Sequence, residues 1–117
     1  LQVGSFIKCA DNTGANLLQI ISVKGGVKTR ICGVANWIIC SVKEGDPKMR
    51  HEVVQAVIIR QVKEYRRKNG MRVKFEDNAA VLINERGEPR GTKIKGPVAK
   101  EVIERFSPIG KIATTVV

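Results

Sequence analysis

The stretch that most constrains the fold runs from Ala56 to Leu82, because it carries the strongest hairpin signal in the chain. An apolar run is followed by a cluster of cations, then by Asn69-Gly70, and then by a second alternating run. Asn-Gly between two such runs indicates a β-hairpin, since both central residues of a type I′ turn need positive φ. We therefore expect two antiparallel strands around this turn.

The length of the hairpin loop decides which side chains share a face. With two loop residues, counting outward from the turn pairs Arg67 with Arg72 and Tyr65 with Lys74. Like charges directly opposite each other destabilise a sheet, so this cationic face needs an anion or abundant water. A loop of three or five residues would separate Arg67 from Arg72. In the predicted register the opposite, apolar face holds Met71, Val73 and Phe75.

The charge of the chain favours an anionic partner. Its 21 Lys and Arg residues against 11 Asp and Glu residues give a formal net charge of +10 and a pI near 10.0. That balance is typical of proteins that bind nucleic acid or an anionic membrane. No apolar run approaches the roughly 18 residues of a membrane-spanning helix, and the first residues match no signal peptide. Nucleic acid is therefore the favoured partner, and we expect no membrane contact.

The pattern of short apolar runs predicts a mainly β fold. Besides the return strand of the hairpin, strands are expected at 5–10, 16–24, 36–43, 53–63 and 78–84. Short connections favour mostly antiparallel pairing in a small barrel or sandwich. The length of 117 residues fits one domain, 1–117, with a C-terminal helical segment at about 96–117. The residues expected in the apolar wall of this domain are Ala56–Ile59, Met71, Val73, Phe75 and Val81-Leu82.

One helix is predicted from Pro97 to Phe106. Proline suits the first helical position, and Val98, Val102 and Phe106 recur at four-residue spacing to give an apolar stripe. Glu101 and Arg105 are also four residues apart, which predicts an ion pair on the outside of the helix.

Residues typical of catalysis or metal binding do not form a recognisable site. The Asp11–Gly14 turn lacks the Asp-Thr-Gly order of aspartic proteases, and His51 is the only histidine. No C-x-x-C pair occurs, so a thiolate zinc site is not expected. The three cysteines, Cys9, Cys32 and Cys40, are interpreted as small buried residues. The sequence predicts no enzyme, no metal site and no cofactor.

Aromatic residues are too few for a protein that binds single strands by stacking. Five occur, and Trp37, the single Trp, stands in an apolar run beside Ile38 and Ile39. A Trp can stack on a base, but in such a run the core or a subunit contact is the favoured interpretation. The expected ligand is therefore structured RNA held by its phosphates.

Cations concentrate around the hairpin. From Lys43 to Lys74 there are ten cations and four acids, and this excess of six is more than half of the net charge. A charge run is usually a solvated face, but a hairpin that opposes like charges favours phosphate as a counter-ion. The basic loop Lys24–Arg30 is either a solvated connection or an arm along the RNA backbone. The candidate RNA-binding residues are Lys24, Lys28, Arg30, Lys48, Arg50, Arg60, Lys63, Arg66, Arg67, Lys68, Arg72, Lys74, Arg90, Lys93 and Lys95.

Several motifs follow one another in the order of a known family. The central one is Ala56–Ile59, then Asn69-Gly70, Phe75, Asn78 and Val81-Leu82. The others are Ala10–Ala15, Ser41–Lys43, Phe75–Ala79, Pro89–Thr92 and Gly96–Ala99. Together they cover nearly the whole chain, which resembles the universal large-subunit ribosomal protein fourteen family in its archaeal and eukaryotic branch. Lys24–Arg30 is shorter than the ribbon usual there, and Ala35-Asn36 stands where the family usually has Gly-Asp.

This resemblance implies a small closed five-stranded antiparallel β-barrel with a projecting β-ribbon and short C-terminal helices. It also implies a cytoplasmic protein of the ribosome that binds large-subunit rRNA, neighbouring large-subunit proteins, and small-subunit rRNA at an intersubunit bridge. An anti-association factor docks on the family near the C-terminal part. The residues expected at that protein contact are Thr92, Lys93, Glu101, Arg105 and Lys111.

Three hypotheses remain open at the level of sequence. An rRNA-binding structural protein predicts that Arg67→Glu and Arg72→Glu weaken RNA binding and leave the fold intact. A basic protein-interaction module would instead dock a regulatory factor through its C-terminal helix, with Val102 and Phe106 as the contact face. A phosphate-processing enzyme would require a divalent-metal site, which the spread of acids does not offer.

Overall fold

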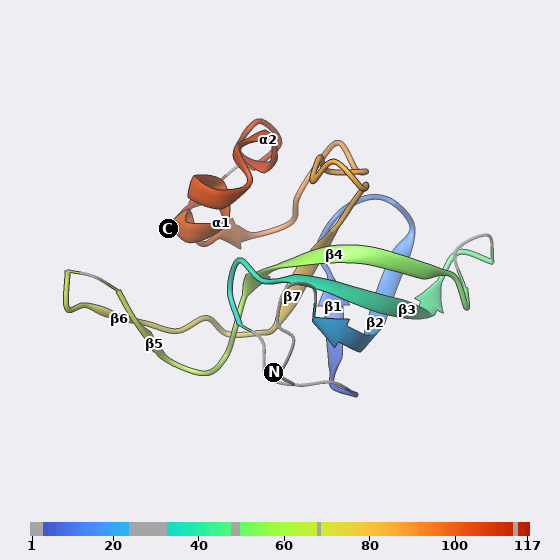
Figure 1. Ribbon diagram of the computed structural model, residues 1–117, viewed down its shortest axis with the longest axis horizontal. Coiled ribbons are helices and arrows are strands. Elements are labelled where there is room, and N and C mark those ends of the chain that lie inside the picture. The colour runs from blue at the N-terminus through green and yellow to red at the C-terminus, as the bar shows by residue number, and fades with distance from the viewer. Residues whose placement is uncertain (1–3, 24–32, 48–49, 68, 114) are drawn as a thin grey trace.

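A five-stranded barrel forms the body of the protein (Figure 1). The computed structural model describes residues 4–23, 33–47, 50–67, 69–113 and 115–117. The barrel strands are β1 (Phe6–Cys9), β2 (Ala15–Val23), β3 (Trp37–Gly45), β4 (Val53–Arg60) and β7 (Ala79–Ile83). Their order is β1-β2-β3-β4-β7; β1 runs parallel to β7 where the barrel closes, and the other neighbours are antiparallel. The predicted closed five-stranded barrel is confirmed, with one parallel pair at its closure.

Alternation along the strands fills the interior of the barrel. Ile7, Leu18, Ile20, Ile38 and Ile58 are each at most 1% exposed and belong to one apolar cluster. Residues two apart on a strand point to the same face, so every strand contributes one row to this core. The barrel core therefore follows directly from the apolar runs of the sequence.

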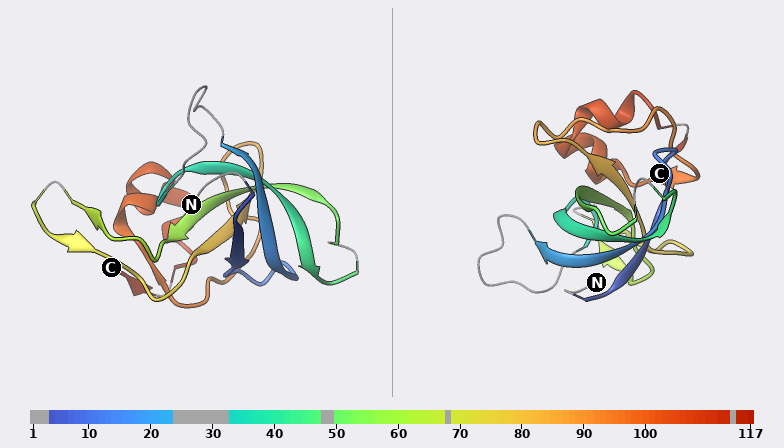
Figure 2. Two further views of the ribbon diagram at one scale, coloured as in Figure 1. Left: turned by 90° about the horizontal axis from the view of Figure 1, so that it is seen from below. Right: turned by 90° about the vertical axis from the view of Figure 1, so that its right-hand side faces the viewer.

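Strands β4 and β7 are buried on both faces. Their outward residues, including Val57, Ile59 and Val81, are fully buried in a second apolar cluster with the C-terminal segment. Helices α1 (Lys100–Arg105) and α2 (Ser107–Gly110) lie over this side of the barrel (Figures 1 and 2). This double burial explains why both strands are apolar at nearly every position.

The C-terminal helix begins at Lys100, three residues later than predicted. Pro97–Val98 forms strand β8, which pairs in parallel with β9 (Thr115–Val116). The Ala99 N–H donates a hydrogen bond to the Ile59 carbonyl oxygen at 3.2 Å. The backbone at this point therefore pairs with the barrel instead of starting the helix. Proline fits either conformation because its fixed φ is compatible with extended as well as helical backbone.

The apolar stripe predicted on this helix is correct in content, but it faces the barrel. Val102 is 0% exposed and Phe106 is 8% exposed. Trp37 makes an edge-to-face contact with Phe106, with 5.8 Å between ring centroids, and its Nε1 donates to Gln55 Oε1 at 2.8 Å. The core interpretation of Trp37 is confirmed. The hypothesis that Val102 and Phe106 form an open contact face is wrong, because the barrel already covers them.

A two-stranded hairpin projects from one end of the barrel (Figure 2). It consists of β5 (Tyr65–Arg66) and β6 (Arg72–Val73), which form a sheet separate from the barrel. Met71 is 63% exposed, so its predicted place in the barrel wall is wrong. Val73 and Phe75 are half-buried outside the barrel strands. The ribbon that the family resemblance places at Lys24–Arg30 lies outside the described residues.

None of the helices in the described ranges has the length and apolar character needed to cross a membrane.

Candidate nucleic-acid interface

The hairpin turn holds three residues between Arg67 and Met71. The Arg67 N–H donates to the Met71 carbonyl oxygen at 2.8 Å, and the Gly70 N–H donates to the Arg67 carbonyl oxygen at 3.0 Å. Gly70 has a φ of 85°. A two-residue type I′ loop would pair Arg67 with Arg72, whereas Arg66 pairs with Arg72, so the two-residue loop is excluded. Instead, Asn69 Oδ1 accepts a hydrogen bond from the Met71 N–H at 3.0 Å.

The predicted register is consequently wrong by one residue. Tyr65 lies opposite Val73, and Arg66 rather than Arg67 lies opposite Arg72. Since the side-chain period of a strand is two, a slip of one residue transfers every side chain of β5 to the other face. Two arginines still lie opposite each other, but Arg66 takes the place predicted for Arg67.

The two faces of the hairpin now have separate roles. Arg66, Arg72 and Lys74 are exposed and follow one face, which we call the outer hairpin face. The ion pairs among the described residues are Arg60–Asp77 and Arg67–Glu101, so the outer hairpin face takes part in neither. Three cations that share one short face and take part in no ion pair among the described residues could bind an external anion.

On the other face, Arg67 and Tyr65 bind α1. Arg67 Nε donates to Glu101 Oε1 at 2.6 Å, and the Tyr65 hydroxyl donates to Glu101 Oε2 at 2.9 Å. Arg67 Nη2 also donates to the Val117 carbonyl oxygen at 2.7 Å. The side chain of Arg67 is 12% exposed and that of Glu101 is 28% exposed. We call Tyr65, Arg67 and Glu101 the clasp; it ties the hairpin to the C-terminal segment.

The ionisation of the clasp is shifted in the direction expected for a bound pair. Burial raises the pKa of Glu101, but hydrogen bonds from Arg67, from backbone and from Tyr65, with the charge of Arg67, outweigh it and lower the pKa overall. Burial and the bond to Glu101 raise the pKa of Tyr65. Glu101 therefore stays ionised and Tyr65 stays a donor at neutral pH. The exposed Glu101–Arg105 pair expected from helix spacing is wrong, because a partner 34 residues earlier in the chain takes the carboxylate.

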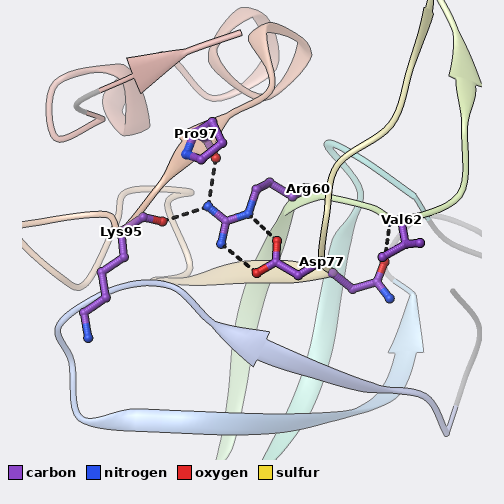
Figure 3. A network of polar contacts seen from close by, with 6 residues as sticks. Arg60, Val62, Asp77, Lys95 and Pro97 are labelled. Atoms are coloured by element: carbon purple, nitrogen blue, oxygen red, sulfur yellow. Dashed lines mark hydrogen bonds and ion pairs between the residues drawn. The ribbon is translucent and has the colours of Figure 1, made fainter.

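Arg60 is internal as well. It is 7% exposed, and its Nε donates to Asp77 Oδ1 at 2.9 Å. Its Nη1 donates to the carbonyl oxygens of Lys95 and Pro97 at 2.7 and 3.0 Å (Figure 3). Because these bonds use its guanidinium within the protein, the predicted contact of Arg60 with RNA is replaced by a structural role. Arg60 fastens the backbone of residues 95–97 to the end of β4.

The remaining predicted cations fall into three groups. Lys24, Lys28, Arg30, Lys48 and Lys68 lie outside the described residues. Arg50 is exposed and is separated from β4 by two residues. The start of β4 lies at the end of the long axis opposite to the hairpin (Figure 1). The others are exposed on the hairpin, at its base or on the loop after β7, namely Lys63, Arg66, Arg72, Lys74, Arg90, Lys93 and Lys95. Sequence reasoning therefore identified the cations but not which ones share a face.

A groove lies at the base of the hairpin, between β6 and β8. It has a volume of about 750 Å³, and Lys8, Lys74 and Lys95 lie along it with Phe75 and Pro97. Lys8 was not among the predicted RNA-binding residues. Its exposed position on the alternating strand β1 was the available signal, but only the fold brings it beside residues 74 and 95.

The residues predicted to contact a protein partner differ in their exposure and in whether their side chains already form hydrogen bonds within the protein. Thr92, Lys93 and Lys111 are exposed, although the Thr92 hydroxyl accepts a hydrogen bond from Asn12 Nδ2 at 2.7 Å. Glu101 belongs to the clasp. Arg105 is exposed, but its Nη1 donates to the Ala35 carbonyl oxygen at 2.9 Å and its guanidinium lies over the Phe106 ring.

The described residues contain no group of three or more His, Cys, Asp or Glu side chains that could hold a metal ion.

Comparison with known proteins gives a consistent result. The family model described as ribosomal protein L14p/L23e matches residues 1–117. The large ribosomal subunit protein uL14 of Methanocorpusculum labreanum is 54% identical over 121 residues, covering 100% of this chain and 92% of the relative. The proteins of the same name from Halorubrum lacusprofundi and Methanothrix thermoacetophila are 55% and 51% identical, with the same coverage.

Proposed function

The chain belongs to the ribosomal protein L14p/L23e family, and from this premise we propose that it binds large-subunit rRNA through the outer hairpin face. Membership in the family confirms the resemblance seen in the sequence and makes the protein a non-enzymatic component of the cytoplasmic ribosome. The finer proposal concerns how it holds RNA.

The observation that carries the proposal is the pair Arg66 and Arg72. They lie directly opposite each other, both are exposed, and Lys74 continues their face. Like charges in this arrangement cost stability in the free protein, by an amount within the roughly 0.2–1 kcal/mol of cross-strand pairs. An RNA phosphate between them removes that cost, and arginine can bind it with two parallel hydrogen bonds. The clasp supports the geometry because it holds the other face of the hairpin against α1.

The test is a binding measurement with large-subunit rRNA and the full chain. Arg66→Glu with Arg72→Glu should weaken binding by tenfold or more, because two attractive phosphate contacts become repulsive. Arg86→Glu is the matched control, since Arg86 is an exposed arginine in the turn after β7. Equal affinity of the double variant and the control would contradict the proposal. Arg67→Glu, the change suggested by the sequence, is unsuitable because it places two carboxylates in the clasp.

We extend the proposal to the subunit interface. Lys93, on the loop after β7, and Lys111, just after α2, are both exposed and take part in neither ion pair of the described residues. They would contact neighbouring large-subunit proteins, small-subunit rRNA at an intersubunit bridge, or a docked anti-association factor. Large subunits carrying Lys93→Glu and Lys111→Glu should assemble normally but join small subunits less readily in sedimentation. If the variant large subunits join small subunits as readily as the wild type does, both with and without the factor, this part of the proposal is contradicted.

A further inference from the structure

The groove at the base of the hairpin combines positive charge with an apolar wall. Its volume of about 750 Å³ falls within the roughly 300–1,000 Å³ typical of ligand sites. Val73, Phe75 and Pro97 line it and are half-buried, so each presents apolar surface to the groove. Lys8, Lys74 and Lys95 also line it, and all three are exposed.

The charge of the groove favours an anion. Asp77 is neutralised by Arg60 at 2.9 Å, which leaves Glu76 as the one carboxylate among the lining side chains without an ion pair. Three lysines from three distant parts of the chain therefore face one free carboxylate. A phosphate would lie toward the lysines and away from Glu76.

The floor of the groove is rigid. Arg60 binds the carbonyl oxygens of Lys95 and Pro97, and Gly96 between them has a φ of 79° (Figure 3). A Cβ on Gly96 would lie 2.5 Å from Arg60 Nη1. The backbone that carries Lys95 is thus fixed against the barrel, which lowers the cost of ordering the site when a ligand binds.

We propose that this groove holds one nucleotide of the bound RNA that is displaced from its helix, with the base against Phe75 and the adjacent phosphate on Lys8, Lys74 and Lys95. The inference rests on the proposed rRNA binding and adds a feature of the RNA to it. Lys74 also belongs to the outer hairpin face, so the groove is continuous with the surface on which the RNA backbone lies. An aromatic ring beside lysines matches a base with its phosphate, because a base presents a flat π-face and a phosphate presents the charge.

The test uses two RNA stems, one fully paired and one with a single bulged 2-aminopurine, and the full-length chain. The wild type should bind the bulged stem at least about fivefold more tightly, which corresponds to the lower end of base–aromatic stacking. Binding should also change the 2-aminopurine fluorescence as the base stacks on Phe75.

Phe75→Leu keeps an apolar side chain and removes the aromatic ring. It should abolish most of the preference for the bulged stem and leave the affinity for the paired stem unchanged. Lys8→Gln with Lys95→Gln should reduce the preference as well, whereas Lys100→Gln, which changes an exposed lysine that does not line the groove, should not. Circular dichroism of each variant checks that the fold is retained.

The outcomes separate this inference from the proposed function. Arg66→Gln with Arg72→Gln should weaken binding to both stems equally and preserve the preference. Equal wild-type affinity for the two stems, or a preference that Phe75→Leu leaves intact, would overturn the nucleotide site while leaving the outer hairpin face in place. Absence of binding to either stem would overturn both. An acidic hexaglutamate peptide that competes only with the bulged stem, with the same lysine dependence, would assign the groove to a protein partner instead.

Discussion

The clasp predicts a measurable coupling between Arg67 and Glu101. Glu101 accepts hydrogen bonds from Arg67 Nε at 2.6 Å, from Tyr65 at 2.9 Å and from Arg67 Nη2 at 3.5 Å. Hydrogen bonds to charged groups contribute about 1.5–3 kcal/mol each when well shielded. The clasp is partly exposed, at 12% for Arg67 and 28% for Glu101, so solvent screens it. We therefore expect a coupling free energy of about 1–2 kcal/mol.

A double-mutant cycle of Arg67→Met and Glu101→Gln isolates this quantity. Each single variant should unfold at a lower urea concentration, and the double variant should cost less than the sum of the two. Glu104→Gln is the control, because Glu104 is an exposed glutamate on the same helix. A loss of about 1 kcal/mol corresponds to roughly 4 °C in Tm for a chain of this length.

The pH dependence supplies a second readout of the clasp. The folded-state pKa of Glu101 lies below its ordinary value of 4.5. The clasp is therefore fully formed above that value and is lost as the pH falls through the folded-state pKa. On acidification from pH 7 to pH 3, the wild type should lose more unfolding free energy than Glu101→Gln. The clasp would be refuted if the unfolding free-energy costs of the two single variants added up to that of the double variant. It would also be refuted if the wild type and Glu101→Gln lost stability equally on acidification.

Three further changes test other parts of the structure. Arg60→Met should destabilise the fold by about 3–5 kcal/mol in urea unfolding, because it leaves Asp77 and two backbone carbonyls without their partner; a cost below about 1 kcal/mol would contradict that network. Gly96→Ala should cost about 2 kcal/mol, from its φ of 79° and the close approach of Arg60, and a neutral effect on thermal unfolding would argue against the tight turn. Burial, and then the charge of Asp11, raise the pKa of the Cys9 thiol to about 12, so iodoacetamide at pH 8 should leave Cys9 unmodified in mass spectra of the folded protein. Asp11→Asn should speed that reaction, and rapid alkylation of wild-type Cys9 would contradict the shift.

The barrel could be predicted from the sequence because its strands carry long apolar patterns in which many residues indicate the same assignment. Strands β4 and β7 are apolar at nearly every position, and the structure buries both of their faces. Alternation in β1 to β3 then places the interior rows. No single residue decides these assignments, so errors of one to three positions at the strand ends did not matter.

The hairpin register could not be predicted from the sequence because it depends on the length of a single turn. Asn-Gly fits a two-residue type I′ turn, but it also fits a three-residue turn in which Gly70 has positive φ. That difference exchanges Arg66 and Arg67 between the two faces. The clasp could not be foreseen either, since Glu101 lies 34 residues from Arg67 and had a suitable local partner in Arg105.

Arg60 is another residue whose role could not be predicted from the sequence. In the sequence it is one cation within a basic run, and its buried role depends on Asp77 and on carbonyl groups 35 and 37 residues away. Composition predicts that cations will bind anions. Only the fold shows whether that anion is internal or external.

The central claim is that Arg66 and Arg72 hold RNA phosphates from the outer hairpin face. Its most direct test is the salt dependence of binding to large-subunit rRNA, measured for the full chain and for Arg66→Gln with Arg72→Gln. Each lost phosphate contact lowers the slope of log K against log salt by roughly 0.7–0.9, so the double variant should be shallower by about 1.5. Arg86→Gln should leave the slope unchanged. If the double variant retains the wild-type slope, these two arginines face water and the claim is contradicted.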